Sequence, residues 1–201
     1  MLVFTRGKGN KLHVINSETL QTETVKETSG HGMFSCLVWK DLVFVGCYEG
    51  HLFIFDLNTF ERKEYKKLQQ GIYDIMLYED DSLPNKKEEF LLFGQHFGHI
   101  DMLRTDNFKK VLTQKPLKVN TIFKMLRVSR KQELALCGYN GLFFAKVKRD
   151  LVKNVFELQM ILTEVYFQDR YVSRAIEFSP DKMLVCVNDD EYFYMIDRSK
   201  K

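Results

Sequence analysis

The feature that most restricts the fold is a short turn pattern that recurs along the whole chain. Each copy has an apolar run, a tight turn and a second run rich in β-branched and aromatic residues. The copies are RGKGNKLHVIN (6–16), GCYEGHLFIFD (46–56), GQHFGHIDMLR (94–104), CGYNGLFFAKV (137–147) and VNDDEYFYMID (187–197). Turn markers at positions 10, 50, 98, 141 and 191 therefore recur at a spacing of about 45 residues, which is typical of propeller blades with four strands.

Each copy contains the residues that a hairpin and a buried strand require. The run before the turn (LVFVGC, FLLFG, LALC or MLVCV) is almost continuously apolar, which predicts a central strand buried on both faces. After the second run, Asn16 and Asp56 can cap the exit turn with their side chains. A tight turn also needs a residue that tolerates positive φ. That residue is, in chain order, Asn10, Gly50, Gly98, Gly141 or Asp190.

A further strand precedes each pair (MFSCLVW, IYDIMLY, TIFKMLRV or YVSRAIEF), so a complete repeat has four strands. The best helical candidate is Lys153–Phe167, but its β-branched and aromatic content and its place in the repeat predict an outer strand and a loop. We therefore predict an all-β fold. It is a β-propeller of antiparallel four-stranded blades, about three complete and two partial, forming a single segment over residues 1–201.

Two segments resemble the core of the WD-repeat (WD40-like) family. Residues 175–197 (AIEFSPDKMLVCVNDDEYFYMID) have an apolar strand, a Phe-Ser-Pro-Asp turn, a second apolar strand, an acidic turn and a third strand closed by Ile-Asp. Residues 42–61 match the same core, with Phe55 and Asp56 where the family has Trp-Asp. The resemblance extends more loosely over the whole chain and implies a WD-repeat propeller.

The chain agrees with the family in one further place and departs from it in three. The dipeptide Gly30-His31 resembles the Gly-His that precedes a WD repeat. The single tryptophan, Trp39, falls in an expected turn, while residues 103–104 (Leu-Arg) and 146–147 (Lys-Val) replace the Trp-Asp pair. We therefore expect irregular blades.

The strand count also bears on how the propeller is completed. The pattern opens inside the second strand of one blade and stops at the third strand of another. A ring of seven blades needs about 315 residues at about 45 each, and the chain has 201. We expect an excerpt of a longer propeller. The alternative is an open arc whose edges are covered by another subunit.

Composition limits the class of protein and its compartment. With 45% hydrophobic and 28% charged residues, the chain can bury a core of its own. The net charge of +3 gives little attraction to polyanions, which argues against a dedicated nucleic-acid binder. The apolar run at the N-terminus is too short for a signal peptide or a membrane span. We expect an intracellular, cytoplasmic protein, with the nucleus also open.

The cysteines and the candidate motifs for chemistry favour structural roles. The cysteines lie far apart and form neither a zinc-ribbon pair nor Cys-x-x-Cys, which predicts reduced, buried thiols. Residues 7–11 (GKGNK) lack the ending of a phosphate loop and occupy a hairpin turn, so we expect no nucleotide cofactor. His96 and His99 should diverge on a hairpin, so we expect no metal site. The four cysteines are Cys36, Cys47, Cys137 and Cys186.

Two charged stretches allow other interpretations. The acidic residues 79–81, followed by residues 84–89 (PNKKEE), should lengthen the first turn of one blade as a solvated loop or, alternatively, as a docking loop. A set of basic residues could line one edge and contact RNA, but Glu133 offsets it and no stacking module accompanies it. This basic set is Lys115, Lys118, Lys124, Arg127, Arg130 and Lys131.

The best candidate surface comes from the turns of the repeat. In a propeller these turns lie on one face, and the WD-repeat resemblance implies that this face binds peptides and proteins. Its aromatic members are the expected anchors, although they could instead only pack on neighbouring loops. The candidate residues are Tyr48, Glu49, His96, Phe97, Tyr139, Asn140, Asp189 and Asp190.

We therefore expect a non-catalytic scaffold that presents this face to a protein or peptide partner within a multiprotein complex. One alternative is a propeller-fold enzyme or small-molecule binder whose channel site uses His96, Asp189 and Asp190. A second alternative is an RNA-associated propeller that uses the basic edge, which predicts a steep dependence of binding on salt. Fold alone does not separate these functions.

Overall fold

The computed structural model describes residues 2–6, 11–27, 32–83, 86–114, 118–128, 133–153, 155–188 and 190–199. Within these residues the regular structure is β-strand, apart from one 3-10 turn, η1, at His96–Gly98. The chain divides into two compact units, residues 1–75 and 76–201, and each is described by itself. That they form a single segment stays a prediction.

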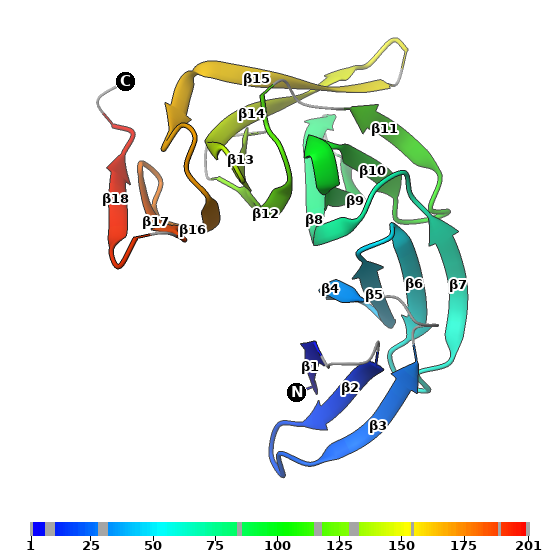
Figure 1. Cartoon of the computed structure of the whole chain (residues 1–201). Coiled ribbons are helices and arrows are strands. Elements are labelled where there is room, and N and C mark those ends of the chain that lie inside the picture. The colour runs from blue at the N-terminus through cyan, green and yellow to red at the C-terminus, as the bar shows by residue number, and fades with distance from the viewer. Residues whose placement is uncertain are drawn as a thin grey trace. The chain divides into compact units, whose positions relative to one another are not determined.

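The first unit contains two antiparallel sheets (Figure 1). One has the order β1-β2-β3 and the other the order β4-β5-β6-β7, so neighbouring strands are consecutive in the sequence. The strands are β1 (Leu2–Arg6), β2 (Lys11–Asn16), β3 (Thr22–Glu27), β4 (Met33–Trp39), β5 (Leu42–Cys47), β6 (His51–Asp56) and β7 (Arg62–Lys67).

The second unit holds the remaining three sheets, again with consecutive strands side by side. The first, whose strand β8 starts just before the unit boundary, contains β8 (Ile72–Leu83), β9 (Lys86–Gln95), β10 (Ile100–Arg104) and β11 (Lys110–Gln114). The second contains β12 (Ile122–Arg127), β13 (Glu133–Gly138), β14 (Gly141–Asp150) and β15 (Val155–Tyr166). The third contains β16 (Val172–Ser179), β17 (Lys182–Val187) and β18 (Phe193–Asp197).

These sheets confirm the predicted blades, three complete and two with three strands each. In the part of the chain that the structure describes, the first sheet lacks the strand that opens a complete blade and the last lacks the strand that closes one, as the repeat indicated. The ambiguous segment 153–167 contains strand β15. Trp39 differs slightly from expectation because it is the last residue of β4 and the turn begins after it.

Burial follows the prediction for the central strands of the complete blades. Strands β5, β9 and β13 are almost entirely buried along the apolar runs. Strand β17 differs, because Met183, Val185 and Val187 are buried but Leu184 and Cys186 are only half-buried. One face of β17 packs in a cluster with β13, β14 and β16.

The cysteines are free thiols, but only two are fully buried as predicted. Cys47 and Cys137 have no exposed surface, and burial raises the pKa of the Cys47 thiol to about 12. Cys186 is half-buried and Cys36 is exposed on β4. The prediction of buried thiols is therefore wrong for Cys36, because an apolar run does not by itself show that both faces of a strand are covered.

The exit turns after β2 and β6 are built from their first side chain, as predicted. Asn16 Oδ1 accepts hydrogen bonds from the backbone N–H groups two and three residues later, at 2.8 and 3.2 Å. Asp56 Oδ1 does the same at 2.8 and 2.9 Å. In both turns the residue four positions on, Leu20 or Phe60, has positive φ and donates its N–H to the carbonyl of the first residue.

Leu20 offers a test of strain in this turn. It has φ of 58° and is 78% exposed, so it bears the cost of the left-handed conformation with little compensating burial. Leu20→Asn should raise the free energy of unfolding by about 0.5–1 kcal/mol, because asparagine tolerates this region better. Urea unfolding measures the change. Leu151→Asn, at an exposed position without positive φ, should give no gain, and a loss at Leu20 would contradict the expectation.

Candidate functional site

The candidate residues lie at the turns between the second and third strands of the sheets. We call this end of each sheet the turn end. Gly50, Gly98 and Gly141 have φ of 84°, 70° and 136°, so these three of the predicted turn markers adopt positive φ. Asn10 and Asp189 lie outside the described residues, as do the GKGN residues 7–10 and the Gly30-His31 dipeptide.

In the first unit, Tyr48 belongs to a cluster of three aromatic rings. Its ring centroid lies 5.6 Å from that of Phe34 and 6.3 Å from that of Tyr73, and Phe34 and Tyr73 are 4.7 Å apart. Tyr48 is 50% exposed, while the other two are half-buried. We call these three residues the first aromatic cluster.

In the second unit, Tyr139 belongs to a cluster of the same composition. Its ring is stacked on Tyr171 at 5.0 Å and lies 5.1 Å from Phe123, and the last two are 4.6 Å apart. Tyr139 is 51% exposed, so the turn aromatic again presents half of its surface while packing on two partners. We call these three residues the second aromatic cluster.

Sequence reasoning missed the supporting rings, and a recurring backbone irregularity explains the position of two of them. The pairing of β4 with β5 shifts register between Met33 and Ser35, and that of β12 with β13 shifts between Ile122 and Lys124. Phe34 and Phe123 are the extra residues at these two bulges, and bulges commonly re-aim a side chain. The available signal was an aromatic residue in the second position of the first strand, as in MFS, IYD and IFK.

The third turn of this kind carries His96 and Phe97, whose ring centroids are 4.0 Å apart. His96 Nδ1 lies 2.8 Å from Thr121 Oγ1, and burial lowers the pKa of His96 below 6.5, so the ring is neutral at pH 7. Phe97 is 50% exposed and has φ of 55°. In the described part of the chain, no group of three or more His, Cys, Asp or Glu is arranged to hold a metal ion.

The polar candidates mainly hold the turns in place. Asn140 Oδ1 accepts the backbone N–H of Asn120 at 2.9 Å, and its amide donates to the carbonyl of Lys118. Asp190 accepts a hydrogen bond from the Tyr194 hydroxyl at 2.7 Å and pairs with Arg170. Glu49 is exposed, and its carboxylate lies 3.7 Å from His51 Nε2. Because Asn140 and Asp190 are bonded within the molecule, the aromatic members of the set are better placed to contact a partner.

The channel site and the basic edge receive less support. The bond described for His96 runs to Thr121, and those described for Asp190 run to Tyr194 and Arg170. Lys118 precedes β12 whereas Arg127 ends it, with the guanidinium 5.4 Å from the centre of the Tyr78 ring. The expectation of one basic edge is therefore wrong for this pair, because the two residues lie at opposite ends of a strand. Residues 115, 130 and 131 lie outside the described residues.

The acidic stretch after Tyr78 is not the solvated loop that its composition predicted. Residues 79–83 continue β8 into a long hairpin with β9, and Asp80 is only 2% exposed. Arg149 Nη1, from β14, lies 2.8 Å from Asp80 Oδ2 and 2.6 Å from Glu88 Oε2. A buried carboxylate needs a counter-charge, and here a residue distant in the sequence supplies it.

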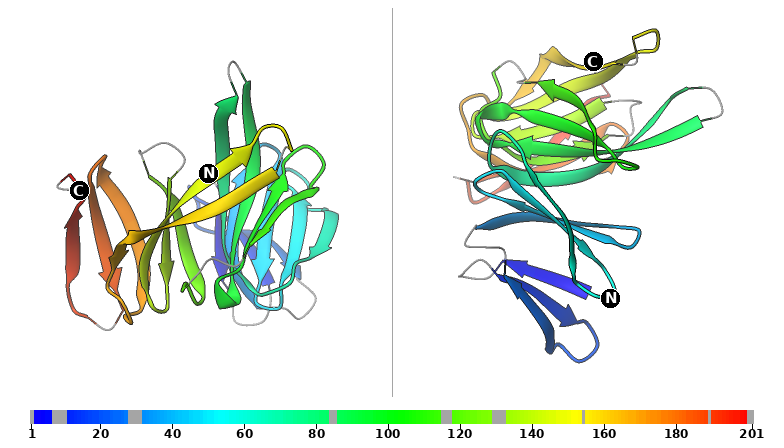
Figure 2. Two further views of the ribbon diagram at one scale, coloured as in Figure 1. Left: turned by 90° about the horizontal axis from the view of Figure 1, so that it is seen from above. Right: turned by 90° about the vertical axis from the view of Figure 1, so that its right-hand side faces the viewer.

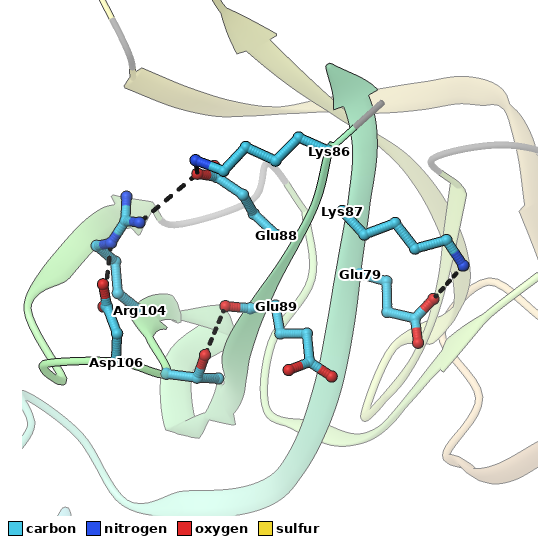
Figure 3. A pocket seen from close by; sticks show the side chains of 8 residues that line it. Glu79, Lys86, Lys87, Glu88, Glu89, Arg104 and Asp106 are labelled. Carbon is cyan, nitrogen blue, oxygen red and sulfur yellow. Dashed lines mark hydrogen bonds and ion pairs between the residues drawn. The ribbon is translucent and has the colours of Figure 1, made fainter. Parts of the chain in front are cut away.

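A charged hollow of about 390 Å³ lies between this hairpin and the turn after β10 (Figure 3). Its charges pair with one another: Lys86 Nζ is 2.7 Å from Glu88 Oε1, Arg104 Nε is 3.2 Å from Asp106 Oδ1, and Arg104 Nη2 lies 3.6 Å from Glu88 Oε1. Lys87 pairs with Glu79 at 3.7 Å. Because charges of both signs already neutralise one another, the hollow is poorly suited to capture a simple ion.

Glu88 gives the ion pairs a measurable dependence on pH. Its carboxyl pKa is lowered from 4.5, first by the hydrogen bond from Lys86 and also by Arg149, although burial opposes the shift. A carboxyl with a lowered pKa stabilises the fold above its unfolded pKa, and this contribution disappears as the pH falls through the folded value. Glu88→Gln should therefore reduce stability at pH 7 and flatten the loss of stability in acid.

The measurement for Glu88 is the free energy of unfolding in urea, from pH 7 down to pH 3. The difference between wild type and Glu88→Gln should shrink as the pH falls below about 4.3, the ordinary value for an unfolded glutamate. Glu18→Gln, in an exposed turn, is the matched control and should track the wild type. A Glu88→Gln difference that is constant across the range would contradict the argument.

Among the comparisons with known proteins, only those with solved structures find matches, and these support the fold alone. No protein-family model matches the sequence, and no curated protein matches it. The computationally designed Ika8 protein matches with a TM-score of 0.67 at 12% identity, over 98% of this chain and 55% of that one. This chain thus spans about half the length of Ika8.

Two further solved structures resemble the chain. The β-propeller domain of Cps50 (Swd1) from Myceliophteria thermophila has a TM-score of 0.57 at 9% identity, over 98% of this chain and 80% of that one. The computationally designed Ika4 protein has a TM-score of 0.58 at 10% identity, over 85% and 94%. With the antiparallel four-stranded sheets, these matches establish a β-propeller fold. Among the described residues, no helix has the length and hydropathy to cross a membrane.

Proposed function

We propose that the chain is a non-catalytic scaffold that binds a protein or peptide segment at the turn end of its blades. The observation that carries this proposal is the recurrence of one construction, a half-exposed tyrosine held by two other rings, in two separate units. Rigid, partly exposed aromatic side chains are the residues that most often dominate binding energy at protein interfaces. Tyr48 and Tyr139 are the proposed anchors, with Phe97 at the turn after β9.

The proposal also covers the finer assignments. The WD-repeat resemblance of residues 42–61 and 175–197 supports a scaffold inside a multiprotein complex in the cytoplasm or the nucleus. The neighbouring polar residues would form the rim of the site, where Asn140 and Asp190 hold the turns in place through bonds within the protein. These polar residues are Glu49, His96, Asn140, Asp189 and Asp190.

Site-specific photo-cross-linking tests the proposal. The cross-linking amino acid p-benzoylphenylalanine is placed at position 48 or 139 of the full chain, which is irradiated in a lysate of its source organism. Because a partner would contact the tyrosines directly, we expect discrete cross-linked species from both positions. Tyr65, which is 45% exposed on the outer strand β7, is the matched control position and should give none of these species.

Competition makes the result specific. An excess of wild-type chain should suppress the cross-links, whereas an excess of Tyr48→Ala/Tyr139→Ala should suppress them at least about tenfold less well, as truncating a binding hot spot implies. Both competitors must show the same thermal unfolding midpoint. Equal suppression by the two chains, or the same species from position 65, would overturn the proposal.

A further inference from the structure

Two sheets pack on the sheet of β12–β15, one on each of its faces. Leu136 of β13 lies in an apolar cluster with the sheet of β8–β11, whereas its neighbour Cys137 lies in a second cluster with the sheet of β16–β18. In the left view of Figure 2, the β16–β18 sheet (orange to red) stands beside the β12–β15 sheet. On any sheet, we call the side that corresponds to Leu136 the preceding face and the side that corresponds to Cys137 the following face.

The following face of the β16–β18 sheet is apolar and open to solvent. Val185 of β17 lies in the cluster with the β12–β15 sheet, so its neighbour Leu184 points to the following face. Strand pairing sets Ile176 and Met195 directly opposite Leu184, and these two side chains are 57% and 51% exposed. Phe193, two residues before Met195, lies on the same face and is 68% exposed. An exposed apolar patch of this kind marks an interaction surface.

The corresponding face of the β12–β15 sheet is completely buried. Cys137 of its second strand and Leu142 and Phe144 of its third strand have no exposed surface, because the preceding face of the β16–β18 sheet covers them. On β18, which is also a third strand, Phe193 and Met195 take the same side of the sheet but lie open. Burial of apolar surface is the main force that drives association, so a preceding face of another sheet would cover these residues favourably.

The charge of Arg174 lies at the margin of this apolar patch. Arg174 is paired opposite Cys186, and β16 forms one edge of its sheet. The guanidinium Nη1 donates to the carbonyl of Phe123 on β12 at 3.3 Å and to that of Ser173 at 2.9 Å. These bonds direct the charge toward the β12–β15 sheet and leave the apolar rows of β17 and β18 open for packing.

The β1–β3 sheet offers a matching face. Leu12 and Val14 of β2 are both 1% exposed and lie in the cluster with the β4–β7 sheet, so they belong to the following face. His13 and Ile15 alternate with them and therefore point to the preceding face, where both are only half-buried. One chain thus carries a partly open preceding face on β1–β3 and an open following face on β16–β18.

We propose that the following face of β16–β18 binds the preceding face of β1–β3 in a second copy of this chain, so that copies associate head to tail. Following faces pack on later sheets within the chain as well, so the contact between copies repeats an arrangement that the fold already uses. The interface is heterologous, because it joins two different surfaces of the same chain. It is independent of the turn-end proposal, since it uses sheet faces and not turns. The residues brought together are His13, Ile15, Ile176, Phe193 and Met195.

Sedimentation equilibrium of the full chain tests the proposal. The mean mass of the wild type should rise above that of one chain as the concentration increases. Ile176→Asp/Met195→Asp blocks the following face and Ile15→Asp blocks the preceding face; each should weaken association at least about tenfold, because it buries an unpaired carboxylate. Val152→Asp, at a 95% exposed residue of the turn after β14, is the control and should associate within about twofold of wild type. A wild type that stays a single chain up to about 0.1 mM overturns the proposal.

A mixture of the two blocked variants separates head-to-tail association from other arrangements. Each variant retains the face that the other has lost, so the equimolar mixture should form a dimer of one copy of each, although neither variant associates alone. Self-association of Ile15→Asp would show that two following faces pair with each other. That result, or a mixture that stays monomeric, overturns the proposal. All variants must keep the wild-type thermal unfolding midpoint, and His13→Glu replaces Ile15→Asp if the latter lowers it.

Discussion

Replacing Arg198 with methionine is expected to lower the free energy of unfolding by about 3–5 kcal/mol, because it removes the buried counter-charge that Glu133 and Glu164 share and leaves Glu133 with the exposed Lys146, 3.7 Å away. Arg198 is 1% exposed. Its Nε lies 2.6 Å from Glu164 Oε2 and its Nη2 lies 2.8 Å from Glu133 Oε2. The guanidinium also lies 3.9 Å from the centre of the Phe144 ring. The contacts join the sheet of β16–β18 to the sheet of β12–β15.

Chemical unfolding measures the effect of Arg198→Met, and two further sets of variants test whether the lost charge is its cause. Adding Glu133→Gln and Glu164→Gln should restore most of the stability, because neutral amides no longer need the arginine charge. Lys63→Met removes an exposed ammonium that lies 2.7 Å from Asp56, and should cost less than about 1 kcal/mol. An Arg198→Met loss as small as that of Lys63→Met would refute the argument.

Gly98→Ala should cost at least about 2 kcal/mol of folding stability, since it combines positive φ with a steric clash. Gly98 has φ of 70°, and an added Cβ would lie 2.0 Å from the Val119 carbonyl oxygen and 2.8 Å from that of Asn120. Both neighbours are backbone atoms, so no flexible side chain can move aside. The thermal unfolding midpoint should fall accordingly.

Gly32→Ala is the matched control for Gly98→Ala. Gly32 has no positive φ, and nothing lies within 4 Å of an added Cβ. Its substitution should leave stability unchanged or raise it by up to about 1 kcal/mol, because alanine restricts the unfolded chain. If both variants lose stability equally, the steric account of Gly98 is wrong.

The sequence was sufficient for the blades because their determinants are local. Positive φ at Gly50, Gly98 and Gly141, and the side-chain caps of Asn16 and Asp56, each depend on a few consecutive residues. A repeated spacing then combines these weak local signals into one architecture. The outer strand β15 could be predicted for the same reason, although its exact length could not.

The features that sequence reasoning missed depend on contacts between distant residues. Arg149 reaches Asp80 across 69 positions, so the acidic stretch looked like a solvated loop until its counter-charge was located. Tyr171 packs on Tyr139 across the junction between two sheets, and the bulge at Phe123 places that ring beside them, which the aromatic residue in the second position of the strand does not by itself predict. The turn aromatics could be predicted, but their supporting rings could not.

The paired hydrogen bonds between Gln114 and Leu158 also hinder association of this chain with other copies through an exposed strand edge. Strand β15 is the long edge strand of its sheet, and the free N–H and C=O groups of such an edge can recruit a strand from another molecule. At Leu158 a side-chain amide occupies both groups as a neighbouring peptide bond would. One glutamine thus blocks part of an edge at which molecules could join into larger aggregates, and it does so without adding a strand.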